Sequence, residues 1–219
     1  MPGGITSQTL FSYYDQLYRV DARLISGDFY QDLSPKSTNG HPYYGDKEWQ
    51  NGSVIIDKTQ FDSLLLRYDI CKNELVCSTL GITNSNVQVS LKKEPITRFT
   101  MRERVFVPFP FTGEGKEIRF CEVLANGPVT LLLLHSKALK VPAGGNSSYT
   151  YEAFSKMSLS INGKIVNYQG KQTLYRLYPQ VKPALRSYIR TEKLRLWGKK
   201  PKQHARLVEF CNSILTTSK

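Results

Sequence analysis

Residues 157–168 read Met-Ser-Leu-Ser-Ile-Asn-Gly-Lys-Ile-Val-Asn-Tyr, and this stretch decides the fold class. Apolar and polar residues alternate from Met157 to Ile161, which is the period of a strand with one buried face. The dipeptide Asn162-Gly163 then supplies the two positive φ angles that a type I′ turn requires. The stretch therefore predicts a β-hairpin.

The same pattern recurs upstream, from about residue 53 onward. A second turn signal, Asn126-Gly127, separates the strand-like runs 118–124 and 129–135. Strands that follow one another through short turns predict an antiparallel sheet, arranged as a sandwich or partial barrel. In three further alternating runs we expect the apolar side chains to point inward: Leu64, Leu66, Tyr68 and Ile70; Val87, Val89 and Leu91; Val105, Val107, Phe109 and Phe111.

The period becomes helical at about residue 171. Pro179 is expected to end a first helix, and Pro183 suits the first turn of a second. Gly198 then stops the second helix, and Pro201 opens a third. The sequence thus predicts an α+β chain, in which the antiparallel sandwich or partial barrel precedes a small C-terminal helical unit.

Three parts are expected along the chain. Residues 1–52 hold a short helix and a long loop packed on the body, residues 53–170 form the antiparallel β body, and residues 171–219 form the basic helical unit. The long loop, 26–52, is rich in Gly, Asn, Ser and Pro. Its aromatic residues are expected to hold it against the body: Phe29, Tyr30, Tyr43, Tyr44 and Trp49.

The composition describes a globular chain. Of its 219 residues, 40% are hydrophobic, which suffices for a core at this length. The longest apolar stretch, 129–134, suits a buried strand and is too short to span a membrane. The four cysteines form no C-x-x-C pair, so buried thiols are favoured over a zinc or redox motif, and two disulfides stay an open alternative. The first residues do not read as a signal peptide, although removal of one would leave the same sequence.

The positive charge is concentrated in the last part of the chain. Residues 171–219 hold 12 Lys or Arg against Glu192 and Glu209, a net of +10 within the total of +12. Such an asymmetry favours an anionic partner, namely a lipid surface or an acidic protein, with nucleic acid as the alternative. The helices offer few Asn or Gln for base contacts, which weakens that alternative. The candidate anion-binding residues are Lys182, Arg186, Arg190, Lys193, Lys199, Lys200 and Lys202.

The first four of these residues follow the spacing i, i+4, i+8 and i+11. On one helix they would form a cationic ridge beside the apolar stripe of Val181, Leu185 and Ile189. A ridge of this kind suits phosphates or anionic lipid headgroups.

No catalytic motif is present. The sequence lacks H-E-x-x-H, G-x-S-x-G and the phosphate-binding loop, and residues 112–116 read as a hairpin tip. The histidines, His41, His135 and His204, are expected at the surface or in turns. We therefore expect no cofactor, no metal and no enzymatic activity. A hydrolase-like enzyme whose carboxylates assemble in space is the rival class, with Asp57, Asp62 and Asp69 as examples.

Six segments of the sequence together carry a resemblance to known proteins: Gly40-His-Pro-Tyr-Tyr, residues 49–52, Leu66-Arg-Tyr-Asp-Ile, residues 120–127, residues 174–179 and Phe210-Cys-Asn-Ser. The chain resembles a group of uncharacterised exported proteins of Gram-negative bacteria, in which a β-rich body leads into Lys-rich helices. The resemblance implies a periplasmic or secreted location, with the cytoplasm as the alternative, and it implies no catalytic residues. The expected function is that of a non-enzymatic binding or structural protein of the cell envelope.

Overall fold

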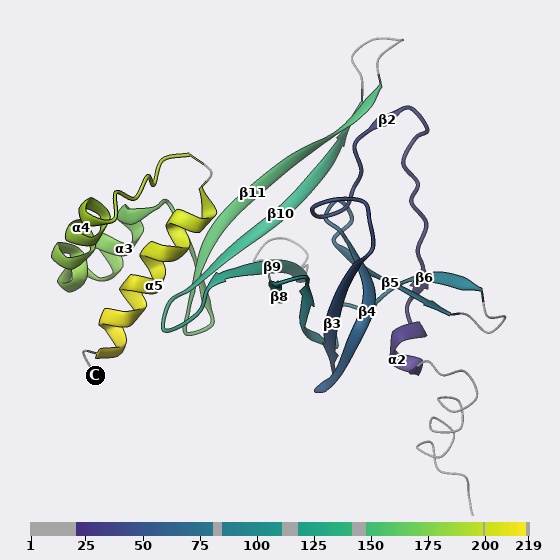
Figure 1. Cartoon of the computed structure of the whole chain (residues 1–219), viewed down its shortest axis with the longest axis horizontal. Helices are drawn as coiled ribbons and strands as arrows, with labels where there is room; N and C mark the ends of the chain where they lie inside the picture. Colours follow the sequence, from purple (N-terminus) through teal and green to yellow (C-terminus); the bar gives the residue numbers. More distant parts are fainter. Residues whose placement is uncertain (1–20, 81–84, 111–117, 142–147, 199, 218–219) are drawn as a thin grey trace, which may run out of the picture. The chain divides into compact units, whose positions relative to one another are not determined.

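The structure is a computed structural model that describes residues 21–80, 85–110, 118–141, 148–198 and 200–217. Within these ranges the chain is an α+β protein whose mostly antiparallel strands precede the C-terminal helices, as predicted (Figure 1). The short helix expected upstream of residue 21 and the hairpin tip at 112–116 lie outside the described residues.

The chain forms two compact units that are interleaved along the sequence. Unit 1 takes in the described residues up to Arg119 and those from Ser136 to Phe154. Unit 2 takes in Phe120–His135 and the described residues from Ser155 onward. Two long strands, β10 and β11, therefore contribute residues to both units.

Unit 1 is built on strands that pair in the order β1-β6-β5-β4-β3-β7-β8, and every neighbouring pair in this order is antiparallel. This order does not return to its first strand, so the sheet is open. The short strand β2 pairs in parallel with the first residues of β11. The elements are α2 (Ala22–Ile25), β1 (Asp28–Phe29), β2 (Thr38–Asn39), β3 (Gln50–Ile56), β4 (Thr59–Asp69), β5 (Glu74–Leu80), β6 (Asn86–Ser90), β7 (Ile96–Met101) and β8 (Arg104–Pro110).

Aromatic side chains form the centre of the core of unit 1. Phe99 and Phe106 stack with ring centroids 4.7 Å apart, and Tyr68 meets Phe106 edge-on at 5.7 Å. All three side chains are buried. The prediction that Val105 and Val107 face inward is therefore wrong, because β8 is apolar on both faces and the larger Phe106 side chain fills the core.

The prediction for the loop 26–52 is confirmed in part. Tyr30 and Tyr43 are buried against the body, with 6% and 4% of their surface exposed, and Trp49 packs on them. Phe29, by contrast, is exposed. The four cysteines are all free thiols, so the disulfide alternative does not apply. Cys77, Cys121 and Cys211 are buried as predicted, whereas Cys71 is exposed.

Unit 2 contains β9 (Ile118–Ala125) from Phe120 onward, the first part of β10 (Thr130–Lys140) up to His135, the second part of β11 (Tyr149–Ile161) from Ser155 onward, and β12 (Lys164–Asn167). The β11–β12 hairpin turns at Asn162 and Gly163 with φ angles of 48° and 76°, which confirms the type I′ prediction. The β9–β10 hairpin is also present, but its connection is longer than two residues because Leu131 pairs with Ala125.

The longer β9–β10 connection is held by a distant side chain. Asn212 accepts a hydrogen bond from the amide of Val129 at 2.9 Å and donates to the carbonyl of the same residue at 2.8 Å. Gly127 lies directly against Asn212, and a Cβ there would approach its Nδ2 to 2.6 Å. The glycine is thus required by this close approach.

The helices of unit 2 begin and end close to the predicted prolines. They are α3 (Lys171–Leu177), a 3₁₀ turn (Pro179–Val181), α4 (Lys182–Thr191) and α5 (Pro201–Thr217). Their apolar faces share one core with the strands, in which Leu131, Leu159, Leu174, Leu185 and Leu207 are fully buried. Within the described part of the chain, none of the helices has both the length and the hydropathy needed to cross a membrane.

Candidate functional site

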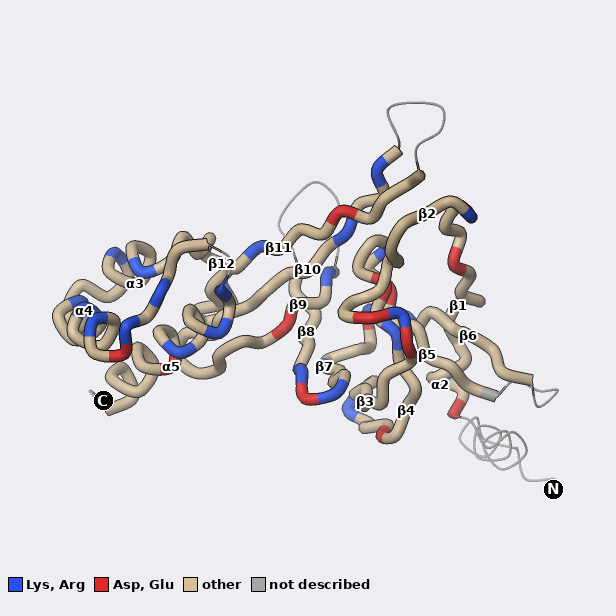
Figure 2. The backbone as a smooth tube through the Cα atoms, turned by 45° about the horizontal axis from the view of Figure 1, so that its top comes forward, with Lys and Arg blue, Asp and Glu red and all other residues tan. Residues whose placement is uncertain are grey.

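The two units differ sharply in charge. Unit 2 holds 14 Lys or Arg against three acidic residues, a net of +11, which leaves +1 for unit 1 out of the total of +12. Figure 2 shows the basic residues of unit 2 spread over α3, α4 and the segment that leads into α5. The structure therefore assigns nearly all of the excess charge to one compact unit.

The structure brings three of the seven predicted anion-binding residues together on one helix. Lys182, Arg186 and Arg190 lie one turn apart along α4. Lys200 and Lys202 lie at the entry to α5, and Lys199 lies outside the described residues.

Lys193 does not continue the ridge, because α4 ends at Thr191 rather than near Gly198. Lys193 has a φ angle of +49°, and its amide donates to the carbonyl of Arg190. The amide of Leu194 donates to the carbonyl of Ile189 at 3.0 Å. This pair of bonds is a Schellman cap, and it turns the chain away from the helix axis.

An aromatic ring positions the two N-terminal members of the ridge. The Nζ atom of Lys182 and the Cζ atom of Arg186 each lie 5.7 Å from the ring centroid of Tyr175. The Tyr175 side chain is buried in the core of unit 2. Cation–π attraction of this kind contributes about 0.5–1 kcal/mol at exposed sites, and here it acts against the repulsion between the two like charges.

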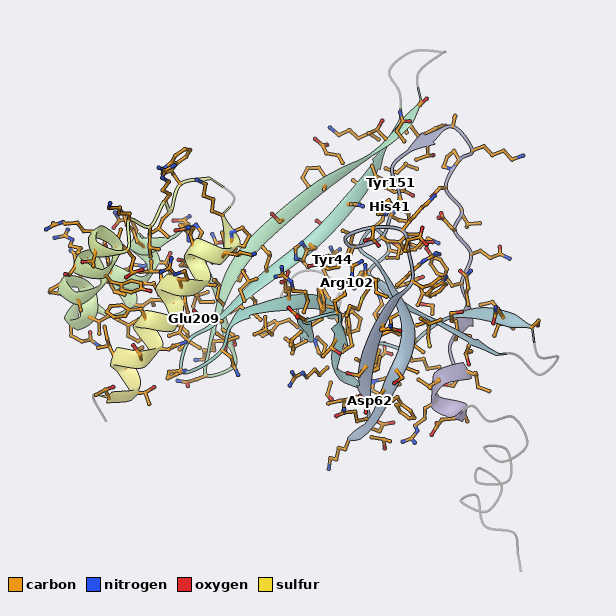
Figure 3. The ribbon with its side chains drawn as sticks, viewed as in Figure 1. His41, Tyr44, Asp62, Arg102, Tyr151 and Glu209 are labelled. Atoms are coloured by element: carbon orange, nitrogen blue, oxygen red, sulfur yellow. The ribbon has the colours of Figure 1, made fainter. Side chains whose placement is uncertain are left out.

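The six candidate anion-binding residues that the structure describes have no acidic partner among the described residues. Of the acids of unit 2, Glu192 pairs with Arg206 and Glu122 pairs with His135. Glu209 is exposed on α5 (Figure 3). No ion pair therefore joins Lys182, Arg186, Arg190, Lys193, Lys200 or Lys202 to these acids.

Trp197, in the loop between α4 and α5, was not predicted from the sequence as part of the site. Its indole is 72% exposed, and the Nζ atom of Lys200 lies 4.6 Å from its ring centroid. Trp197 also lines a cavity of about 270 Å³ with mixed walls, polar at Gln169, Lys171 and Gln172 and apolar at Ile189, Leu194 and Leu196. The sequence signal was the run Trp-Gly-Lys-Lys at 197–200, but no local pattern tells whether such a tryptophan is buried or exposed.

The histidines are divided between the units, with His41 in unit 1 and His135 and His204 in unit 2. His204 is buried rather than at the surface, and its Nδ1 lies 3.1 Å from the hydroxyl of Tyr168. Burial lowers the pKa of His204. The pKa of His41 is also lowered, first by burial and then by the charge of Lys137. Among the described residues, no group of three His, Cys, Asp or Glu side chains is placed to hold a metal ion.

The three predicted carboxylates do not converge either. Asp57 and Asp62 are exposed, whereas Asp69 is fully buried. Its Oδ1 accepts hydrogen bonds from the amides of Cys71 and Lys72, both at 2.8 Å, so its role is tied to the β4–β5 turn.

Comparison of the chain with protein-family models, with curated proteins and with solved structures found no match.

Proposed function

We propose that this protein is a non-enzymatic binding protein of the cell envelope, and that unit 2 binds an anionic lipid surface. The observation that carries the proposal is the exposed Trp197 beside Lys200, within a unit whose net charge is +11. The resemblance to exported proteins of Gram-negative bacteria supports the envelope location.

Lipid headgroups suit the exposed Trp197 and its neighbouring cations better than an acidic protein or nucleic acid does. Tryptophan is enriched at membrane–water interfaces, because its ring is apolar and its N–H is polar. Arg195, Leu196 and Trp197 follow the Schellman cap, so the loop between α4 and α5 combines apolar and basic residues. This combination is typical of segments that lie in the headgroup region.

The energies are sufficient for reversible binding. Each basic residue close to an anionic leaflet contributes about 1 kcal/mol, and the attraction decays within a Debye length of about 8 Å at physiological salt. Lys182, Arg186 and Arg190 on α4 supply three such charges before the loop is counted. Insertion of the Trp197 ring adds the transfer of apolar area out of water, at about 25 cal/mol per Å².

Co-sedimentation with vesicles tests the proposal. We expect the full chain to sediment with vesicles of phosphatidylglycerol and phosphatidylcholine at low salt, and not with phosphatidylcholine alone. Arg186→Glu combined with Arg190→Glu should abolish most of this binding. The matched control is Lys36→Glu combined with Lys92→Glu, because it makes the same change in net charge on exposed residues of unit 1.

The outcomes separate the lipid surface from other partners. Equal loss in the two double variants would show that only net charge matters, and would contradict a specific role of unit 2. Binding to duplex DNA without binding to anionic vesicles would replace the lipid proposal with nucleic acid. Trp197→Ala should weaken vesicle binding and leave any DNA binding unchanged.

A further inference from the structure

Unit 1 contains a polar cavity of about 560 Å³ that the proposed membrane function does not use. Its volume lies within the range of about 300–1,000 Å³ that small-molecule sites occupy. Asp32, His41, Tyr43, Lys47 and Arg67 contribute to its lining. Figure 3 labels His41, one of these lining residues.

The loop that forms one wall of the cavity is fixed by backbone contacts. The amide of Ile70 donates to the carbonyl of Pro42 at 3.0 Å, and the Nζ atom of Lys137 donates to the carbonyls of His41 and Tyr43 at 2.7 and 2.8 Å. These bonds join the loop to the end of β4 and to β10. This part of the lining is therefore held in place by the fold itself, which lowers the cost of ordering it when a ligand binds.

Tyr30, Tyr43 and Asp32 line a second, hydrogen-bonded wall of the cavity, with the buried Asp69 behind it. Tyr30 donates to Oδ2 of the buried Asp69 at 2.7 Å, and its hydroxyl lies 3.4 Å from that of Tyr43. Tyr43 donates in turn to Oδ2 of Asp32 at 3.2 Å. Burial raises the pKa of both tyrosines, so they stay protonated and keep donating.

Arg67 contributes the donor groups that the protein itself does not use. Its guanidinium lies over the rings of Trp49 and Tyr43, with the Cζ atom 4.2 and 5.0 Å from the two centroids. Among the described residues it has no carboxylate partner and no hydrogen bond, and its Nε is buried. Nδ1 of His41 is likewise buried without a hydrogen-bond partner among those residues.

The net charge of the lining residues favours a monoanionic ligand. Lys47 and Arg67 are cations and Asp32 is an anion, while the lowered pKa of His41 keeps that ring neutral at pH 7. The titratable lining residues thus carry a net charge of +1, which a monoanion neutralises and a dianion does not. A planar carboxylate matches the two parallel N–H groups of an arginine fork.

We propose that this cavity binds a small organic monocarboxylate through the guanidinium of Arg67, with His41 and Lys47 beside it. The aromatic rings under Arg67 restrict the guanidinium, so less side-chain entropy is lost when the ligand binds. This inference concerns unit 1 alone, and it is independent of the lipid surface proposed for unit 2.

Titration calorimetry on the full chain tests the inference. The probes are lactate, glucuronate and benzoate, which present the same carboxylate on different bodies, and each is compared with its neutral amide. Inorganic phosphate serves as the more highly charged anion. We expect at least one of the three acids to bind with a Kd below about 10 mM, and its amide to bind at least about tenfold more weakly.

Variants of Arg67 assign the binding to this cavity. Arg67→Met should weaken binding of the acid by at least about tenfold, and Arg67→Lys should give an intermediate loss because it keeps the charge without the fork. Arg98→Met, an exposed residue of β7 in the same unit, should leave the affinity unchanged. A melting temperature within a few degrees of the parent would show that each variant is folded.

Three results would overturn the inference. They are the absence of binding by all three acids, affinity that is unchanged in a folded Arg67→Met protein, and preferential binding of phosphate. None of these results bears on vesicle binding by unit 2, so failure here and failure of the proposed function are distinguishable.

Discussion

Unit 1 and unit 2 each form a buried core, but their net charges differ sharply. Unit 1 balances 16 Lys or Arg against 15 acidic residues, whereas unit 2 sets 14 against three. Both have a well-buried apolar core, aromatic at the centre of unit 1 and largely aliphatic in unit 2. The excess cations of unit 2 are therefore not needed by its core. Their mutual repulsion opposes the folding of unit 2, and the proposed anionic partner would relieve it.

The largest expected effect is a core deletion in unit 2. Leu207→Ala removes a fully buried side chain and should lower the free energy of unfolding by about 2–5 kcal/mol. Chemical denaturation measures the loss, and amide exchange locates it. If the units unfold separately, the amides of α5 lose protection while those of β3 and β4 in unit 1 keep theirs. Gln172→Ala, an exposed position on α3, should change the stability by less than about 0.5 kcal/mol.

A somewhat smaller loss is expected when the bridge from α5 to the β9–β10 connection is removed. Asn212→Ala leaves the amide of Val129 without its acceptor, which should cost about 1–3 kcal/mol in chemical denaturation. Ser213→Ala is the matched control, because Ser213 is the next residue and bonds only within its own helix. An equal effect of both changes would mean that the bridge does not stabilise unit 2.

Acidification should destabilise both units through different histidines. Burial lowers the pKa of His204 in unit 2, so the unfolded chain takes up a proton before the folded one does. The stabilisation is complete at neutral pH and is lost as the pH falls below about 6.5. His204→Gln should flatten this dependence in denaturation experiments at about pH 7.5 and 5.5, while the contribution of His41 in unit 1 persists. An unchanged slope would contradict the assignment to His204.

The smallest effect concerns salt. Because unit 2 has a net charge of +11, screening should stabilise it as the Debye length falls from about 30 Å at 0.01 M to about 10 Å at 0.1 M. Amide exchange should show better protection in α4 and α5 at the higher salt, with little change in the strands of unit 1. In the Arg186→Glu and Arg190→Glu double variant the salt effect should shrink. A salt effect of equal size in both units would argue against self-repulsion in unit 2.

Local signals in the sequence predicted much of this fold. Pro179, Pro183 and Pro201 predicted where the helices of unit 2 begin and end, because proline restricts its own φ angle and the conformation of the residue before it. Asn162-Gly163 predicted a turn that depends on its own two backbone conformations. These features are set within a few residues, so a single sequence suffices to find them.

The features that the sequence did not predict depend on distant partners. The connection after Asn126 is lengthened by Asn212, more than 80 residues away, and Asp69 is buried because Tyr30 reaches it across 39 positions. Phe106 faces inward because Phe99 stacks on it. None of these contacts produces a periodic pattern of residue types in the sequence.

The candidate site shows the same division. Lys182, Arg186 and Arg190 were predicted to share one face of a helix, and helical periodicity alone places them there. Lys193 was misplaced, because the Schellman cap uses a residue at positive φ for which glycine would have been the usual signal. The exposure of Trp197 depends on how the loop after this cap packs, which the sequence does not encode in any short motif.

The fluorescence of Trp197 tests the central proposal most directly. The chain has two tryptophans, so Trp49→Phe leaves Trp197 as the only one. If unit 2 binds an anionic lipid surface, the emission of Trp197 shifts to shorter wavelength when phosphatidylglycerol vesicles are added at low salt, and the shift reverses as salt is raised. Vesicles of phosphatidylcholine alone should leave the emission unchanged. An emission spectrum that does not respond to phosphatidylglycerol vesicles would contradict the proposal that this loop enters the headgroup region.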